Sequence, residues 1–326
     1  MPTPSLRETL ETRQIPLYFG TVVLAGLIAI WQPATQGLAG AIDPLLAFML
    51  FVTFLQVPMH ELRRAASNLR FVGALALANF LLIPLLVLAM LPWLPGDPLL
   101  RIGVLLVLLT PCIDYVVTFA HLGRADARAL LASTPLLLAA QMLLLPFYLR
   151  LLLDADAARL VQWGPFLHAF VWLIAVPLGL AALCQAWGRR RAAGARALDL
   201  LGVMPVPATA AVLAVVVASV TPQLAVAMDA VRQVAPLYLG FALLAPLLGW
   251  GVARLCRLPL PQRLAVAFSS ATRNSLVVLP LGLAIPGALP VLPAVIVTQT
   301  LIELVSQLLY VRLGRTLAGA AARART

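Results

Sequence analysis

Long apolar stretches recur along the whole chain, and each is long enough to cross the hydrocarbon core of a bilayer, which takes about 20 helical residues. Of the 326 residues, 62% are hydrophobic and only 11% are charged. Soluble domains are about 45–50% apolar and about 25% charged. Transmembrane β-strands would require short segments of alternating polarity, which continuous apolar runs do not supply. The sequence therefore predicts an all-α polytopic membrane protein.

Charged and Pro/Gly-rich breaks divide the chain into candidate membrane helices. The ten spans cover residues 16–34, 38–59, 71–93, 98–122, 128–153, 164–188, 196–220, 230–256, 262–286 and 290–315. The expected organisation is an N-terminal cytoplasmic segment, a first five-helix repeat, a second five-helix repeat and a C-terminal cytoplasmic tail, over residues 1–15, 16–153, 164–315 and 316–326. Because five is an odd number, the second repeat must enter the membrane inverted relative to the first.

The basic residues indicate how the chain is oriented. All 23 are arginines, and they gather in alternate loops. With both termini in the cytoplasm, eighteen arginines fall on the cytoplasmic side and four on the outer side, namely Arg101, Arg150, Arg159 and Arg232. This asymmetry follows the positive-inside rule and predicts a multi-pass protein of the cell inner (plasma) membrane with both termini inside. The net charge of +11 is thus attributed to topology, and no nucleic-acid partner is expected.

Two of the candidate spans carry polar residues near their middle. The fourth contains TPCID, residues 110–114, and the ninth contains SSATRNS, residues 269–275. Cys112 and Asn274 are 162 residues apart, which is close to half of the chain length. Paired interrupted helices in inverted repeats indicate the binding site of a secondary transporter, because irregular backbone at membrane depth must be buried or line a cavity. We therefore expect broken helices 4 and 9 to cross at a translocation site.

Three ionisable residues are expected deep in the membrane, where a charge costs about 2.5–3.5 kcal/mol on insertion scales. Arg273 could attract an anionic substrate, stand as a fixed charge where a coupling cation would otherwise bind, or form an ion pair with Asp114 or Glu303. Asp114 forms a polar stripe with Thr118 and His121, and this stripe could be a path for protons or solute. Alternatively, Asp114 is only a local partner, either for Arg273 or for exposed helix backbone. Glu303 is interpreted as a proton carrier, the usual role of a lone membrane carboxylate.

The polar faces of two further spans support this interpretation. Glu303 shares one face of the tenth span with Gln299, Ser306, Gln307 and Tyr310. Thr134 and Gln141 share a face of the fifth span in the same way. Polar faces in lipid usually point to the interior of the bundle, where they line a pathway or simply join helices by hydrogen bonds.

The three cysteines differ in their position relative to the interrupted spans. Cys112 follows Pro111 at the first interruption, where a thiol is either a soft ligand for a thiophilic solute or a small buried hydrophobe. Cys184 and Cys256 are expected near cytoplasmic helix ends and are interpreted as structural. The chain contains no Walker A loop, and its three histidines are dispersed, so neither a cofactor nor a resident metal is expected.

At these residues the chain resembles the bile acid/sodium symporter superfamily, and more narrowly its arsenical-resistance arsenite permease branch. Cys112 in TPCIDYVV and Glu303 in TQTLIELV match the cysteine and the glutamate of those permeases. The resemblance implies a panel domain of spans 1, 2, 6 and 7 and a core domain of spans 3–5 and 8–10. It also implies export of trivalent arsenite, often antimonite, in exchange for protons.

The ninth span departs from the pattern of the sodium-coupled members, which resemble one another in a Glu-…-Gln-Asn sequence. Here Ser269 stands in place of that Glu, and Arg273 stands in place of the Gln that precedes Asn274. Losing a carboxylate and gaining a cation should weaken a sodium site and favours proton coupling. Asp114 departs from the usual arsenite-permease motif.

We therefore expect a secondary transporter rather than an enzyme, an arsenite/proton antiporter that works by alternating access. The predicted substrate and translocation residues are Cys112 (arsenic contact), Asp114, Thr134, Arg273, Asn274 and Ser275, and the predicted proton-coupling residues are Glu303 and Asp114. One alternative is an organic-anion carrier of the same fold in which Arg273 holds a substrate carboxylate. A membrane sensor or scaffold is disfavoured because it gives no reason for two matched helix breaks. The sequence does not indicate an oligomeric state.

Overall fold

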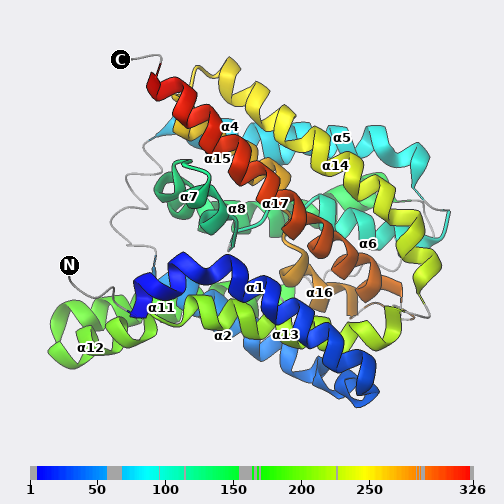
Figure 1. Ribbon diagram of the computed structural model, residues 1–326, viewed down its shortest axis with the longest axis horizontal. Coiled ribbons are helices and arrows are strands. Elements are labelled where there is room, and N and C mark those ends of the chain that lie inside the picture. Colours follow the sequence, from blue (N-terminus) through cyan, green and yellow to red (C-terminus); the bar gives the residue numbers. More distant parts are fainter. Residues whose placement is uncertain are drawn as a thin grey trace. The chain divides into compact units, whose positions relative to one another are not determined.

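The computed structural model divides the chain into two compact units (Figure 1). It describes residues 6–56, 68–94, 96–113, 115–153, 164, 167–168, 170–224, 227–283, 285, 287 and 291–323. Unit 1 comprises Met1–Met59 with Leu167–Val226, and unit 2 comprises His60–Phe166 with Ala227–Thr326. Unit 1 therefore collects spans 1, 2, 6 and 7, and unit 2 collects spans 3–5 and 8–10. This is the grouping that the resemblance implies for a panel and a core domain.

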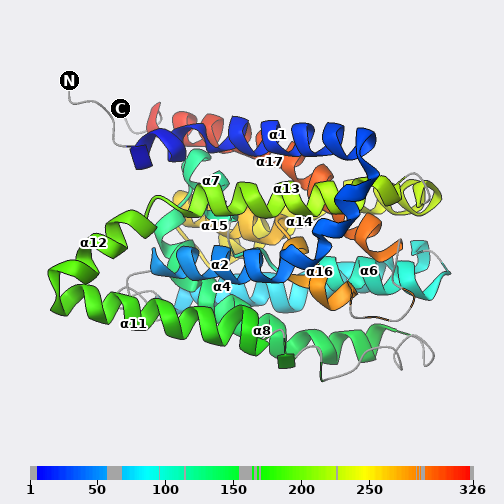
Figure 2. The same cartoon turned by 90° about the horizontal axis from the view of Figure 1, so that it is seen from below.

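Unit 1 is built around close contacts between small side chains. Its elements are α1 (Leu6–Trp31), η1 (Pro33–Ala41), α2 (Ile42–Leu55), η4 (Phe170–Ala175), α11 (Val176–Arg190), α12 (Ala192–Leu201) and α13 (Pro205–Leu224). α1 packs along α13, where Ala25 and Ala29 lie against Val217 and Ala218. Such small residues let membrane helices approach closely. α2 packs against both α11 and α13 (Figure 2).

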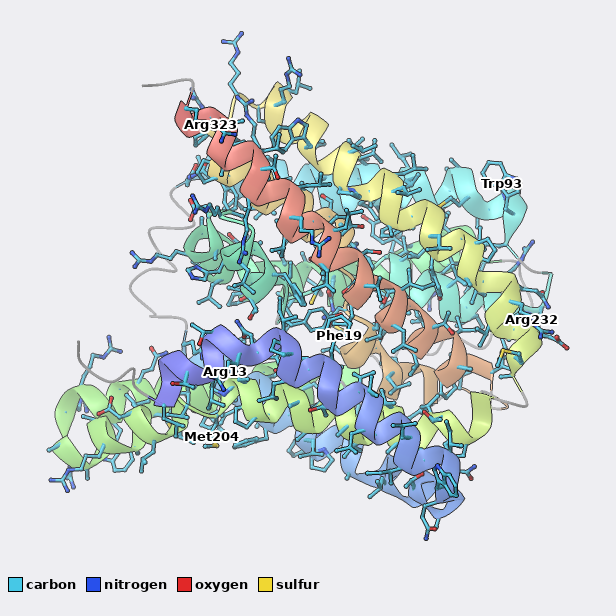
Figure 3. All side chains as sticks on the ribbon, viewed as in Figure 1. Arg13, Phe19, Trp93, Met204, Arg232 and Arg323 are labelled. Carbon is cyan, nitrogen blue, oxygen red and sulfur yellow. The ribbon has the colours of Figure 1, made fainter. Side chains whose placement is uncertain are left out.

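Unit 2 contains both interrupted helices. Its elements are α4 (Leu69–Leu77), η2 (Ala78–Leu82), α5 (Ile83–Met90), η3 (Leu91–Trp93), α6 (Pro98–Leu108), α7 (Tyr115–Leu122), α8 (Ala127–Leu152), α14 (Met228–Leu255), α15 (Leu260–Ala271), α16 (Ser275–Leu283) and α17 (Val291–Arg323). α14 packs along α15 and α17. Trp93 and Arg232 lie toward one end of this unit and Arg323 lies toward the other (Figure 3).

Eight helices in the described part of the chain are long and apolar enough to cross a membrane. The two remaining expected spans, 98–122 and 262–286, each divide into two short helices. α6 has 11 residues and α15 has 12, so each is only about 16–18 Å long at 1.5 Å per residue. Neither crosses a hydrocarbon core of about 30 Å alone. The prediction of a polytopic all-α membrane protein with interrupted fourth and ninth helices is confirmed.

Helix ends differ most from the expected span ends at three places. α1 begins at Leu6, within the expected N-terminal segment, and α17 continues to Arg323, within the expected C-terminal tail. The expected seventh span, 196–220, divides into α12 and α13, and α13 begins at Pro205. Hydropathy reports where an apolar run ends, whereas a helix continues as long as its own backbone hydrogen bonds persist. Proline is favoured at a helix start because the missing N–H would have no partner there.

Candidate functional site

The two interrupted helices of unit 2 meet through their backbones. Pro111 pairs with Arg273 in an antiparallel bridge. The flanking hydrogen bonds run from Cys112 N–H to Thr272 O, at 2.9 Å, and from Asn274 N–H to Thr110 O, at 2.8 Å. Each break thus satisfies backbone groups that the other one exposes, which membrane-depth backbone requires. We call residues 109–113 and 272–274 the crossing, and it confirms the expected meeting of the two breaks.

Arg273 is fully buried beside the crossing, with an exposed fraction of 0%. Its guanidinium donates to four protein oxygens, which we call the oxygen cage. They are Asn79 Oδ1 at 2.8 Å, Ser269 O and Ser270 O at 2.7 Å each, and Leu108 O at 3.3 Å. The ring of Phe241 lies 5.4 Å from the guanidinium carbon and adds a cation–π contact.

The oxygen cage supplies neutral hydrogen-bond partners for the buried guanidinium. Three of its four oxygens are carbonyls from the last turns of α6 and α15, where the partial negative charge of a helix is concentrated. In the described part of the chain the guanidinium forms no ion pair with Glu303, one of the partners expected from the sequence. The other expected partner, Asp114, lies outside the described residues.

Asn79 is a residue of this site that the sequence analysis missed. It lies in η2, a π-helical segment, and is fully buried. Besides accepting from Arg273, its amide donates to Leu75 O at 3.1 Å and to Ser269 Oγ at 3.0 Å. π-helical turns inside α-helices frequently occur at functional sites. The available signal was a single amide side chain in the apolar run from 71 to 93.

Glu303 connects α17 to both interrupted helices. Its carboxylate is 2% exposed, and Oε2 accepts from the backbone N–H of Arg273 at 2.6 Å and from Gln299 Nε2 at 2.5 Å. Oε1 accepts from the hydroxyl of Tyr115, the first residue of α7, at 2.5 Å. Ser275, the first residue of α16, donates in turn to Gln299 Oε1. Tyr115 was also missed, and its only signal was its position directly after TPCID.

The remaining predicted residues differ in how they relate to this network. Cys112 is fully buried in the crossing, and Asn274 is 2% exposed. The side-chain Nδ2 of Asn274 has no hydrogen-bond partner in the described part of the chain. Thr134 is fully buried on α8, where its hydroxyl donates to Leu131 O of its own helix at 2.7 Å. The structure therefore brings Cys112 and Asn274 to the crossing and gives Thr134 a local partner.

A helical membrane protein whose two interrupted helices meet at a buried polar crossing has the architecture of a secondary transporter. The chain belongs to the Sodium Bile acid symporter family, whose sequence profile matches residues 43–227, more than half of its length. The protein is thus a membrane transporter, and the resemblance inferred from the sequence is confirmed for the superfamily. The matched region includes Cys112, whereas Arg273 and Glu303 lie beyond it. No curated protein matches the chain.

Proposed function

We propose that this protein exports trivalent arsenite, and antimonite by the same chemistry, in exchange for protons by alternating access. The observation that carries the proposal is the position of segment 272–274 between a thiol-bearing residue and a carboxylate. On one side Thr272 O accepts from the backbone N–H of Cys112, and on the other the backbone N–H of Arg273 donates to Glu303. A soft ligand and a protonatable group thus share one buried site.

The crossing offers the chemistry that trivalent arsenic requires. The substrate is a neutral, hydroxylated solute whose arsenic atom favours sulfur, and Cys112 supplies that soft ligand. Its hydroxyl groups need polar partners, and Asn274 offers an amide with no partner among the described residues. Ser275 begins α16, so the amide end of that helix also faces this region. Thr134 and Asp114 complete the proposed substrate residues.

The oxygen cage supports coupling to protons rather than to sodium. In transporters, carbonyl oxygens at the ends of half-helices and in unwound segments are the groups that coordinate a coupling cation. Here three backbone carbonyl oxygens at the ends of α6 and α15, together with Asn79 Oδ1, are engaged by the guanidinium of Arg273, which is covalently attached to the chain. A tethered cation cannot be exchanged across the membrane. This leaves Glu303, and with it Asp114, as the proposed proton carriers.

The arginine distribution supports an inner-membrane location with both termini in the cytoplasm. Arg232 belongs to the predicted outer group and Arg323 to the predicted cytoplasmic group. Their positions toward opposite ends of unit 2 agree with that assignment (Figure 3).

The organic-anion alternative requires Arg273 to hold a substrate carboxylate. Its two terminal nitrogens are directed to the oxygen cage, and of its side-chain nitrogens only Nε has no partner in the described part of the chain. A carboxylate would therefore have to displace protein oxygens to make a bidentate contact. The cage thus favours arsenite over an organic anion.

A tolerance assay tests the proposal. Cells that lack their own arsenite pump would express the wild type, Cys112→Ser, Glu303→Gln and the control Cys256→Ser, with membrane expression measured for each. We expect wild type and control to restore growth on arsenite and the other two variants to fail. A wild type that is well expressed but gives no tolerance refutes arsenite export. Sodium-dependent uptake of an organic acid into proteoliposomes, abolished by Arg273→Ala, would establish the alternative.

A further inference from the structure

The two oxygens of the Glu303 carboxylate have chemically different partners. Oε2 accepts from two nitrogens, the backbone N–H of Arg273 and the side-chain amide of Gln299. Oε1 accepts from the hydroxyl of Tyr115. A backbone N–H and an amide NH₂ can only donate, whereas a phenolic hydroxyl both donates and accepts. The two oxygens therefore respond differently when the carboxylate takes up a proton.

A proton on Oε2 would point at two groups that cannot accept it. One of them, the N–H of Arg273, belongs to a segment fixed on both sides by the backbone hydrogen bonds of the crossing. Breaking these contacts would leave buried donors without partners, at about 1–3 kcal/mol each. A proton on Oε1 keeps every contact of the carboxyl group, because the bond to Tyr115 only reverses its direction and the hydroxyl hydrogen of Tyr115 turns away from Oε1. The neutral acid then donates to the phenolic oxygen.

We infer that Tyr115 is the proton-relay residue for Glu303, so that protons reach and leave the carboxyl group through Oε1. This inference rests on the proposed proton-coupled function. In the uptake step, the Tyr115 oxygen receives a proton from hydronium and passes its own hydroxyl proton to Oε1. One proton enters and one is delivered; the carboxylate becomes neutral, and the tyrosine is neutral before and after. Release follows the reverse order.

Two other ionisable side chains near the carboxyl group, in the described part of the chain, are engaged elsewhere. The guanidinium of Arg273 is directed to the oxygen cage, and Tyr310, further along α17, donates its hydroxyl to Ala242 O. Among the described residues, Tyr115 is thus the side chain that touches the carboxylate and can both give and accept a proton.

Two transport assays in proteoliposomes test the inference. One measures net arsenite movement driven by a pH gradient, and the other measures exchange of labelled for unlabelled arsenite at equal pH, which moves no net protons. We expect Tyr115→Phe to slow net transport by about 10²-fold, the scale of lost proton-transfer catalysis, while exchange stays near the wild-type rate. Tyr115→His, which can also donate and accept, should recover part of the net transport. Tyr310→Phe removes a partly buried hydroxyl from α17 and should leave both rates unchanged.

If Tyr115→Phe slows net transport and exchange to the same extent, the role of Tyr115 is structural and the inference is overturned. The inference is also overturned if neither rate changes. A wild type that moves no arsenite in either assay, or that exchanges it without responding to the pH gradient, would instead contradict the proposed function. Infrared difference spectroscopy of the purified protein distinguishes a failure of the relay inference from a failure of the proposed function. The band of protonated Glu303, identified by its loss in Glu303→Gln, should shift in Tyr115→Phe and not in Tyr310→Phe. An unmoved band in Tyr115→Phe overturns the relay whatever the substrate.

Discussion

The backbone N–H of Arg273 donates to Oε2 of Glu303 at 2.6 Å, while the charged end of the same arginine is directed to neutral oxygens. Arg273 therefore contributes to the site in two ways. Its backbone fixes the carboxylate of α17 to the crossing, and its guanidinium neutralises the helix ends that form the oxygen cage. Substitution of the side chain removes the second contribution and leaves the first in place.

Arg273→Ala is expected to destabilise the protein by vacating the oxygen cage. Each buried acceptor left without a donor costs about 1–3 kcal/mol, so the melting temperature should fall. Because the emptied space has the shape and ligands of a guanidinium site, millimolar guanidinium ion should restore part of the lost stability. The measurement is the melting temperature of the purified variant in the presence of guanidinium and, for comparison, in the presence of choline. Arg232→Ala, which removes an exposed arginine, is the control and should respond to neither ion. Melting that is insensitive to guanidinium would contradict the cage.

Asn79→Leu is expected to lower stability because the change leaves a guanidinium donor of Arg273 without its acceptor and the hydroxyl oxygen of Ser269 without its amide donor. The expected loss is about 1–3 kcal/mol in the free energy of unfolding. Asn79→Asp keeps an acceptor for the guanidinium and should lose less. Ser133→Ala, which removes a hydroxyl bound to the Ala129 carbonyl of its own helix, serves as the control. Chemical unfolding of the purified variants provides the comparison, and an Asn79→Leu variant as stable as Ser133→Ala would speak against the assigned contacts.

Gly249→Ala is expected to disturb the site from a distance. A Cβ at this position of α14 would lie 2.4 Å from Ser270 Oγ and 2.9 Å from Val266 O, so α15 would have to move and take the Ser270 carbonyl with it. Overpacking of this kind costs about 1–3 kcal/mol, and arsenite transport should fall with stability. Gly251→Ala lies two residues away on the same helix, where a Cβ meets no atom within 4 Å. Equal transport and melting of the two variants would show that this contact is unimportant.

Cys112→Ser is expected to weaken arsenite binding itself, apart from any effect on transport. Loss of the sulfur contact should lower the affinity at least about tenfold, which corresponds to about 1.4 kcal/mol. Binding of labelled arsenite to the purified protein measures this directly. Cys184→Ser and Cys256→Ser change the other two thiols, which lie outside the crossing and are only partly buried, and should bind as the wild type does. Unchanged binding in Cys112→Ser would reduce this thiol to a packing role.

The interruptions of helices 4 and 9 were predictable because their causes are local. Pro111 has no N–H to donate, and the polar residues around it and around Asn274 stand out from apolar runs. Helix α12 and the first turns of α1 were harder to predict, because both lie outside the apolar segments that hydropathy detects. Asn79 and Tyr115 could not be found in this way. Their partners Ser269 and Glu303 lie 190 and 188 residues away in the sequence.

The sequence by itself determined that the chain is a helical membrane protein with two matched breaks, because transfer of an apolar segment into lipid and the loss of a backbone donor at proline depend only on neighbouring residues. It also predicted that three charged residues, Asp114, Arg273 and Glu303, lie deep in the membrane. Only the tertiary structure decided that Arg273 is directed to carbonyl oxygens and that Glu303 accepts from Tyr115. Those directions depend on how helices distant in the sequence pack, and no local pattern encodes that packing.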